Sequence, residues 1–153
     1  MDEAAITYFE DPPYDFLSNF HAAAVRLDGV EYPTVEHAYQ AAKTLDDAER
    51  AHVRSAPTPA EAKQRGGEVT LRPGWNDIKV DVMRDLLQQK FAGGILRDRL
   101  LATAPRVLIE GNTWGDRFWG VYHGEGQNRL GRLLMEVRDA DAAQGNAADR
   151  EAK

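Results

Sequence analysis

Four polar side chains with the spacing of one helical face lie between residues 34 and 44. They are Glu36, Tyr39, Gln40 and Lys43, at positions i, i+3, i+4 and i+7. Side chains with this spacing share one face of an α-helix. A face directed at a protein core usually carries Leu, Ile or Val, whereas this one carries a carboxylate, a phenol, an amide and an amine. The pattern therefore predicts a face that meets either water or a substrate.

The two ionisable ends of this face are too far apart to pair directly. Glu36 and Lys43 are two helical turns apart, which is roughly 10 Å along the axis. One bound molecule could contact both side chains. Charged helix faces are also commonly just solvated, so the pattern alone leaves both interpretations open.

Local signals define the elements that hold this face in place. Thr34 has the residue type and position of a helix N-cap, and the helix is expected to run to about Thr44. Before it, alternating residues from 23 to 32 flank the turn-forming pair Asp28-Gly29, which predicts a β-hairpin. The polar face is thus expected to follow directly after a hairpin.

The rest of the chain is expected to be mainly helical. Thr58-Pro59-Ala60-Glu61 forms a capping box, and Gly66-Gly67 marks the end of that helix. Regular βαβ alternation is absent. The predicted class is α+β: a mainly helical single domain with a small antiparallel sheet, covering residues 1–138 and followed by a disordered acidic tail at 139–153. Further helices are expected at about 46–54, 75–92, 95–102 and 130–138, and strands at 6–9 and 107–110.

Two later segments could also build a site. The loop from 110 to 121 contains Trp114, Trp119, Asp116 and Arg117 between glycines, a composition suited to stacking on a base. The alternative is that Trp114 and Trp119 are core anchors, and the composition slightly favours the functional interpretation. The glycine-rich segment 124–132 precedes a helix and could receive a phosphate, although Asn128 is also explained as a simple N-cap.

Composition excludes several classes of protein. The 153-residue chain has no cysteine, and His21, His37, His52 and His123 lack metal-site spacing, so no metal is expected. His37 is expected to be partly exposed on its helix. The net charge of −6 argues against a general binder of nucleic-acid backbone. The sequence has no membrane span and no signal peptide, so a cytoplasmic location is expected.

The order of these motifs resembles the NADAR family, also called YbiA-like. The similarity runs from about residue 6 to residue 138, with two local departures at His21-Ala22-Ala23 and Asn112-Thr113-Trp114. The matching segments are Phe16-Leu17-Ser18-Asn19-Phe20, the stretch from Tyr32 to Lys43, Ala62-Lys63-Gln64-Arg65-Gly66, Trp75-Asn76, Asp116-Arg117-Phe118-Trp119-Gly120, and the stretch from Gly126 to Met135.

The resemblance implies an enzyme, a hydrolase of N-glycosyl bonds. Its substrate would be an ADP-ribosylated guanine nucleoside or nucleotide, ADP-ribosylated nucleic acid, or a phosphoribosylated intermediate of riboflavin synthesis. No metal and no cofactor are implied. The mechanism suggested is capture of ribose C1′ by a lysine as a Schiff base, assisted by a carboxylate.

Carried over position by position, the resemblance assigns several site roles. Lys43 corresponds to the nucleophile and Glu36 to the catalytic carboxylate. The pocket walls correspond to Asn19, Phe20, Asp116, Trp119, Gly120, Asn128 and Gly131.

The proposed chemistry suggests further contacts. Tyr39 or Trp119 would stack on the base, and Arg65, Arg117 or Arg129 would receive phosphate oxygens. Ser18 and Gln40 are also expected to contact substrate.

Two other functions compete with this prediction. A non-catalytic module that binds NAD or ADP-ribose would use the same pocket, yet would tolerate loss of Lys43 or Glu36. A purely structural partner protein would show no nucleotide-dependent change in melting temperature.

Overall fold

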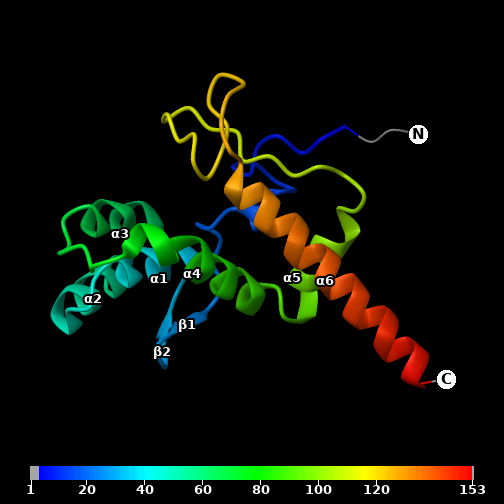
Figure 1. The fold of residues 1–153 in the computed structure, drawn as a ribbon, viewed down its shortest axis with the longest axis horizontal. Helices are drawn as coiled ribbons and strands as arrows, with labels where there is room; N and C mark the ends of the chain where they lie inside the picture. Colours follow the sequence, from blue (N-terminus) through cyan, green and yellow to red (C-terminus); the bar gives the residue numbers. More distant parts are fainter. Residues whose placement is uncertain (1–3, 153) are drawn as a thin grey trace. The chain divides into compact units, whose positions relative to one another are not determined.

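The computed structural model describes the backbone of residues 4–152 and the side chains of residues 4–145. The chain separates into two compact units, one formed by residues up to Ser18 together with those from Phe91 onward, and the other by Asn19–Lys90 (Figure 1). Each unit is described by itself. The described residues form six α-helices and one two-stranded antiparallel sheet, which confirms the predicted mainly helical α+β class.

The predicted hairpin is present in the Asn19–Lys90 unit. Strand β1 (Val25–Leu27) pairs antiparallel with β2 (Val30–Tyr32). The connecting residues Asp28 and Gly29 have φ angles of 48° and 81°. Two consecutive positive φ values are typical of the turns that join hairpin strands, and Asp-Gly is a favoured pair for them. The chain leaves β2 at Tyr32 and enters the next helix two residues later.

Helix α1 (Val35–Ala42) is the centre of this unit. The hydroxyl oxygen of Thr34 accepts the backbone N–H of His37 at 3.0 Å, which is the predicted N-cap. Helices α2 (Asp47–Arg54), α3 (Pro59–Gly66) and α4 (Trp75–Lys90) pack around α1 (Figure 1). All eight residues of α1 are buried. Its polar face therefore lies against protein rather than open solvent.

The expectation that His37 is partly exposed is wrong. Its side chain is 2% exposed. Ring atom Nδ1 lies 2.8 Å from the hydroxyl oxygen of Thr34, and Nε2 lies 3.0 Å from the carbonyl oxygen of Ala56. Both ring nitrogens thus have partners, so a polar side chain is tolerated in the core. The ring ties the start of α1 to the loop before α3.

The other unit contains a short 3-10 helix η1 (Asp15–Leu17), α5 (Gly94–Ala102) and α6 (Arg129–Ala152). Of the strands predicted at 6–9 and 107–110, only a parallel bridge from Ile6 to Leu108 is present. The guanidinium of Arg138 donates to Thr103 Oγ1 at 3.0 Å and to the Arg106 carbonyl at 2.7 Å. This buried cation links α6 to the residues that follow α5.

Helix α6 runs past Arg138, the residue at which the sequence predicted its end. The segment that follows is rich in alanine, which has the highest helix propensity. Within it, the carbonyl of Asp141 accepts a hydrogen bond from Arg97 Nη2 at 3.0 Å. That residues 139–153 lie outside the folded domain stays a prediction.

Candidate functional site

A buried carboxylate lies in the first turn of α1. Glu36 is 7% exposed. Its Oε1 accepts a hydrogen bond of 2.8 Å from Nε2 of Gln40, one turn later on the helix. Burial raises the pKa of Glu36, while the Gln40 hydrogen bond and the positive charges of Lys63 and Lys43 oppose that rise. Loss of hydration is the largest effect, so the environment favours the protonated acid relative to a free glutamate.

The amine at the end of α1 has a partly buried, aromatic environment. Lys43 follows the last residue of the helix, and its Nζ lies 5.9 Å from the centre of the Tyr39 ring. Tyr39 in turn packs on Trp75 with ring centres 5.3 Å apart. Burial lowers the pKa of Lys43. The charge of Glu36 opposes this shift, and those of Lys63 and Lys79 add to it.

Together these two groups have the protonation tendencies of a nucleophile and an acid. A lysine attacks carbon only as the neutral amine, and its lowered pKa increases that fraction. A carboxyl group donates a proton only when protonated, and the raised pKa of Glu36 increases that fraction. Opposite pKa shifts of neighbouring groups are typical of acid–base sites, although structural ion networks also produce them.

Asn19 lies beside the start of α1. Its carbonyl oxygen accepts the Glu36 N–H at 3.1 Å, and its side-chain Nδ2 donates to Met83 Sδ at 3.6 Å. The side-chain Oδ1 is buried and has no hydrogen-bond partner within the described part of the chain. Phe20, the next residue, is 42% exposed. The structure thus places one predicted substrate contact next to Glu36, with an acceptor still available.

Arg65 is engaged within α2 and α3. Its Nη1 donates to the His52 carbonyl at 2.7 Å and to Ser55 Oγ at 3.2 Å, and its Nη2 pairs with Glu61 at 3.2 Å. These contacts hold the two helices together. A role for Arg65 in binding phosphate stays a prediction.

In the other unit, Asp116 organises the aromatic loop. Its Oδ1 accepts the backbone N–H groups of Phe118 at 3.0 Å and Trp119 at 2.9 Å. The rings of Phe118 and Trp119 meet edge to face at 4.9 Å. The exposed Arg117 lies over the ring of Tyr122 at 5.1 Å. The loop is therefore ordered by its own contacts, and its role in binding substrate stays a prediction.

Asn128 has a packing role that the sequence did not show. It has a φ of 50°, donates from Nδ2 to the Leu108 carbonyl at 2.9 Å and accepts the Glu110 N–H at 2.9 Å. A side chain at Gly131 would collide with this amide, and one at Gly120 would collide with the Glu110 carbonyl.

Ser18 follows η1 and is half-buried. Substrate contact by Ser18, Gly120, Asn128 and Gly131 stays a prediction.

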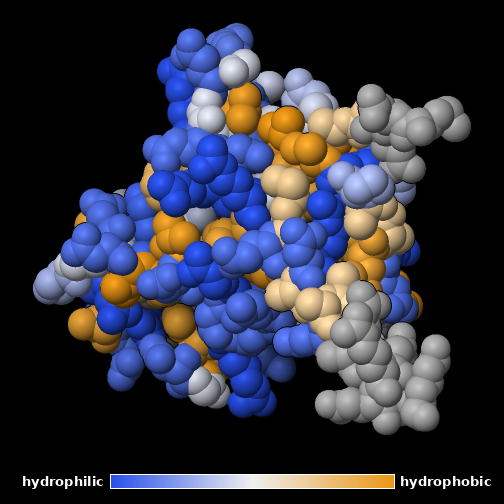
Figure 2. Space-filling view, turned by 45° about the vertical axis from the view of Figure 1, so that its right-hand side comes forward, coloured by the Kyte–Doolittle hydropathy of each residue, from blue (hydrophilic) through white to orange (hydrophobic). Residues whose placement is uncertain are grey.

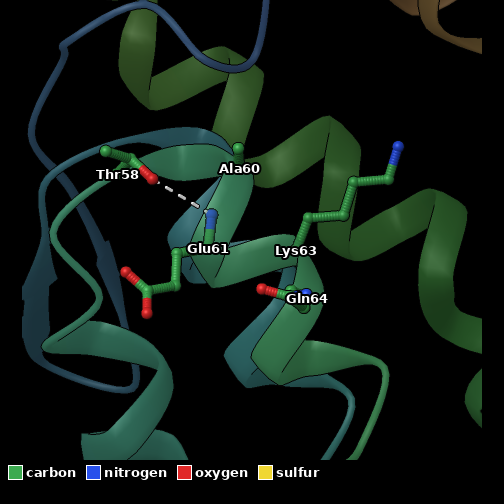
Figure 3. Close-up of a pocket in the computed structure, with 5 residues that line it drawn as sticks. All are labelled: Thr58, Ala60, Glu61, Lys63 and Gln64. Atoms are coloured by element: carbon green, nitrogen blue, oxygen red, sulfur yellow. Dashed lines mark hydrogen bonds between the residues drawn. The ribbon is translucent and has the colours of Figure 1, made fainter.

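A hollow of about 530 Å³ lies along α3, lined by Thr58, Ala60, Glu61, Lys63 and Gln64 (Figure 3). None of these residues was among the site residues predicted from the sequence. The Lys63 side chain extends away from Glu61 in this view, and its charge acts on both Glu36 and Lys43. Lys63 is therefore a residue of electrostatic importance that sequence reasoning missed. Its position within the Ala62–Gly66 motif was the available signal.

Hydrophilic side chains cover most of the face drawn in Figure 2, with apolar residues in limited areas between them. No helix in the described chain has the length and apolar character needed to span a membrane. Among the same residues, no group of three or more His, Asp or Glu side chains is arranged to hold a metal ion.

Comparison with known proteins identifies the class. A family model described as the NADAR domain matches residues 7–140. An N-glycosidase YbiA from Escherichia coli strain K12 is 41% identical, over 91% of this chain and 89% of its own. A riboflavin biosynthesis protein from Vibrio vulnificus is 36% identical over 91% of this chain and 39% of its own.

The fold agrees with these matches. An NMR structure of the E. coli protein YbiA has a TM-score of 0.82 and 40% identity, and the match covers 95% of this chain and 88% of that one. The chain therefore belongs to the NADAR family. The predicted α+β single-domain fold and the predicted enzyme class, a glycosidase, are both confirmed by these relatives.

Proposed function

We propose that this protein is an N-glycosidase that cleaves the bond between ribose C1′ and a nucleobase nitrogen. Its substrate is an ADP-ribosylated nucleobase, notably guanine, or a phosphoribosylated intermediate of riboflavin synthesis. Relatives named N-glycosidase and riboflavin biosynthesis protein support the reaction class. The observation that carries the proposal is the position of Glu36 in the first turn of α1 and of Lys43 at its C-terminal end, with pKa shifts in the directions that the chemistry needs.

The proposed first step breaks the glycosidic bond. The electron pair of the C1′–N bond goes to the base nitrogen, which takes the proton of Glu36. The neutral amine of Lys43 supplies its lone pair to C1′ and loses a proton. Departure of the ring oxygen from C1′, with uptake of a proton, opens the ribose and leaves a Schiff base between C1′ and Nζ.

The second step restores the enzyme. Water adds to the Schiff-base carbon and gives up a proton that returns to Glu36. The C1′–Nζ bond then breaks, which returns the neutral amine and releases the ADP-ribose or ribose phosphate as its aldehyde or ring form. The net reaction consumes one water and yields the free base. Nζ of Lys43 lies 5.9 Å from the centre of the Tyr39 ring, and burial lowers the pKa of Lys43, which supports an amine that is neutral before attack.

Borohydride trapping tests the covalent step. Wild-type protein incubated with ADP-ribosylated guanosine, or with a phosphoribosylated pyrimidine, is reduced and its intact mass is measured. An adduct that maps to Lys43 and disappears in Lys43→Ala is expected. Lys79→Ala is the control for loss of a nearby lysine: it removes one charge that lowers the pKa of Lys43, so trapping should slow, but the adduct should still map to Lys43. Equal trapping by Lys43→Ala would remove Lys43 as the nucleophile.

Release of free base from the same panel tests the function itself. A base released from one substrate class identifies which of the two reactions the protein performs. No release from either class, with nucleotide binding intact, would favour a binding module instead.

A further inference from the structure

The side-chain amide of Gln40 joins two helices at the site. Its nitrogen faces Glu36 on α1, with the hydrogen bond of 2.8 Å to Oε1. Its oxygen faces α3, where it is buried and accepts no hydrogen bond within the described residues. Burying an amide oxygen without a donor costs free energy. This orientation of the Gln40 amide is explained if its nitrogen is needed to donate to the Glu36 carboxylate.

Gly66 supplies the space on the α3 side. A Cβ atom added at Gly66 would lie 2.6 Å from Cβ and 2.7 Å from Cδ of Gln40, and nearer still to Oε1. Real Cβ atoms essentially never come this close to another heavy atom, so any side chain there would displace the amide. Gly66 is the last residue of α3 and has no positive φ. Its lack of a side chain is therefore needed for space and not for backbone conformation.

The neighbouring glycine has no such contact. Gly67 is exposed, has a φ of −69°, and an added Cβ would meet only the Gln64 carbonyl at 3.4 Å and the Lys63 carbonyl at 3.9 Å. These are ordinary van der Waals distances. The two adjacent glycines thus differ in one respect that matters here: only Gly66 abuts Gln40.

We propose that Gln40 and Gly66 are positioning residues for Glu36, with Gly66 seating the Gln40 amide and the amide fixing the carboxylate toward the ribosyl substrate. The role in catalysis rests on the function proposed above, whereas the seating of Glu36 does not. Gln40, predicted from the sequence to contact substrate, acts in this proposal through Glu36. Gly66 changes from a helix terminator to a determinant of the site.

The arrangement has a measurable electrostatic consequence. A donor to the charged carboxylate stabilises its ionised form, and the Gln40 hydrogen bond lowers the pKa of Glu36 against the larger effect of burial. Displacing the amide removes this donor. The titration midpoint of Glu36 then moves to higher pH, and the carboxylate loses its fixed direction.

The test is a titration of the substrate-free protein. The side-chain carboxyl carbons of glutamate are followed by ¹³C NMR against pH, and the Glu36 signal is identified by its absence in Glu36→Gln. Gly66→Ala and Gln40→Ala are each expected to raise the Glu36 midpoint. Gly67→Ala is the matched control and is expected to titrate like wild type. In a Gln40→Gly background, Gly66→Ala should add nothing further, because the Cβ, Cδ and Oε1 atoms that its side chain would meet are all gone.

The outcomes separate the proposal from a merely structural role. A folded Gly66→Ala with a wild-type Glu36 midpoint, or a shift that Gly66→Ala adds in the Gln40→Gly background, would overturn it. If Gly66→Ala does not fold, recovery of a folded protein in Gln40→Gly/Gly66→Ala supports the contact. Failure to recover, when Gln40→Gly folds on its own, overturns it.

Base release by the same variants then reports on catalysis. A loss of about tenfold or more is expected for Gly66→Ala, comparable to losing one hydrogen bond to a charged group, and no loss for Gly67→Ala. If wild type releases no base but the titration shifts appear, the proposed function is wrong, while the positioning of Glu36 by Gln40 and Gly66 is supported.

Discussion

The Nζ atom of Lys43 lies 5.9 Å from the centre of the Tyr39 ring, one turn away at the end of α1. A ring in this position has two opposing effects on the amine. Its π face attracts the ammonium form, while its bulk displaces water that the ammonium needs. The pKa of Lys43 is lowered, with burial as the largest cause. We expect the part of this burial that the ring supplies to be lost when the ring is removed.

Replacing the ring should make Lys43 an ordinary lysine. In Tyr39→Ala, water reaches Nζ, so the pKa of Lys43 rises toward its usual 10.5. The rate of labelling of Lys43 by an amine-selective reagent, read by peptide mass spectrometry against pH, reports the neutral fraction directly. Its midpoint should lie below the usual value in wild type and move upward in Tyr39→Ala. Tyr39→Phe keeps the ring and should behave like wild type; an equal shift in both variants would contradict the explanation.

Lys63 should tune both ionisable groups in the same direction. Its positive charge lowers the pKa of Glu36 and of Lys43. In Lys63→Gln both pKa values rise, so both limbs of a bell-shaped pH–rate profile should move to higher pH. The limbs belong to the interacting pair rather than to one residue each. In Gln40→Ala, by contrast, the removed hydrogen bond acts only on Glu36, so only the pKa of Glu36 should rise. A profile of Lys63→Gln that overlays wild type would rule out the electrostatic role.

We expect the buried carboxylate of Glu36 to lower the stability of the folded protein at high pH. Its pKa is raised in the folded protein. Its contribution to stability is therefore complete below the unfolded pKa of about 4.3 and is lost as pH rises through the folded value. Glu36→Gln keeps an acceptor for Gln40 and removes the buried charge. We expect the variant to be more stable than wild type at pH 8, by about 0.5–2 kcal/mol, with the difference shrinking at pH 5, while base release is lost.

Glu49 serves as a control, because its carboxyl pKa is shifted in the direction opposite to that of Glu36. Hydrogen bonds from Thr44 and Thr70 lower the pKa of its carboxyl group. Its stabilisation is present above the unfolded pKa and is lost as pH falls through the folded value. Thermal melts of Glu49→Gln should therefore show a loss of stability at pH 8, whereas Glu36→Gln shows a gain. Equal behaviour of the two variants would contradict the assignment of a buried charge to Glu36.

The sequence predicted well those features that depend on neighbouring residues. The caps at Thr34 and Thr58 each accept the N–H three residues later, as expected, and Asp28-Gly29 forms the hairpin turn. The helical spacing correctly placed Gln40 beside Glu36 and Lys43 beside Tyr39. Each of these depends on backbone geometry within one or two turns, which a single sequence carries.

Features set by distant packing were not accessible in the same way. The burial of α1 comes from α2, α3 and α4, so a polar face could not be recognised as enclosed. His37 satisfies its ring through the carbonyl of Ala56, nineteen residues away. The contact of Gly66 with Gln40 joins two helices, and nothing in either local sequence distinguishes Gly66 from Gly67. Sequence patterns thus selected candidate residues, but they could not show which side chains contact one another across helices.

Asn128 provides the clearest separation of a packing role from a substrate role. Its amide bridges the Leu108 carbonyl and the Glu110 N–H. Loss of both bonds in Asn128→Ala should lower the free energy of unfolding by about 2 kcal/mol, since the backbone groups left behind are partly buried. Asn128→Gly keeps a residue that tolerates its φ of 50° and isolates the amide from backbone strain. The exposed neighbour serves as control, so Gln127→Ala should melt like wild type. If Asn128→Gly instead retains wild-type stability and binds nucleotide more weakly in a thermal-shift titration, Asn128 is a substrate contact and the bridge is secondary.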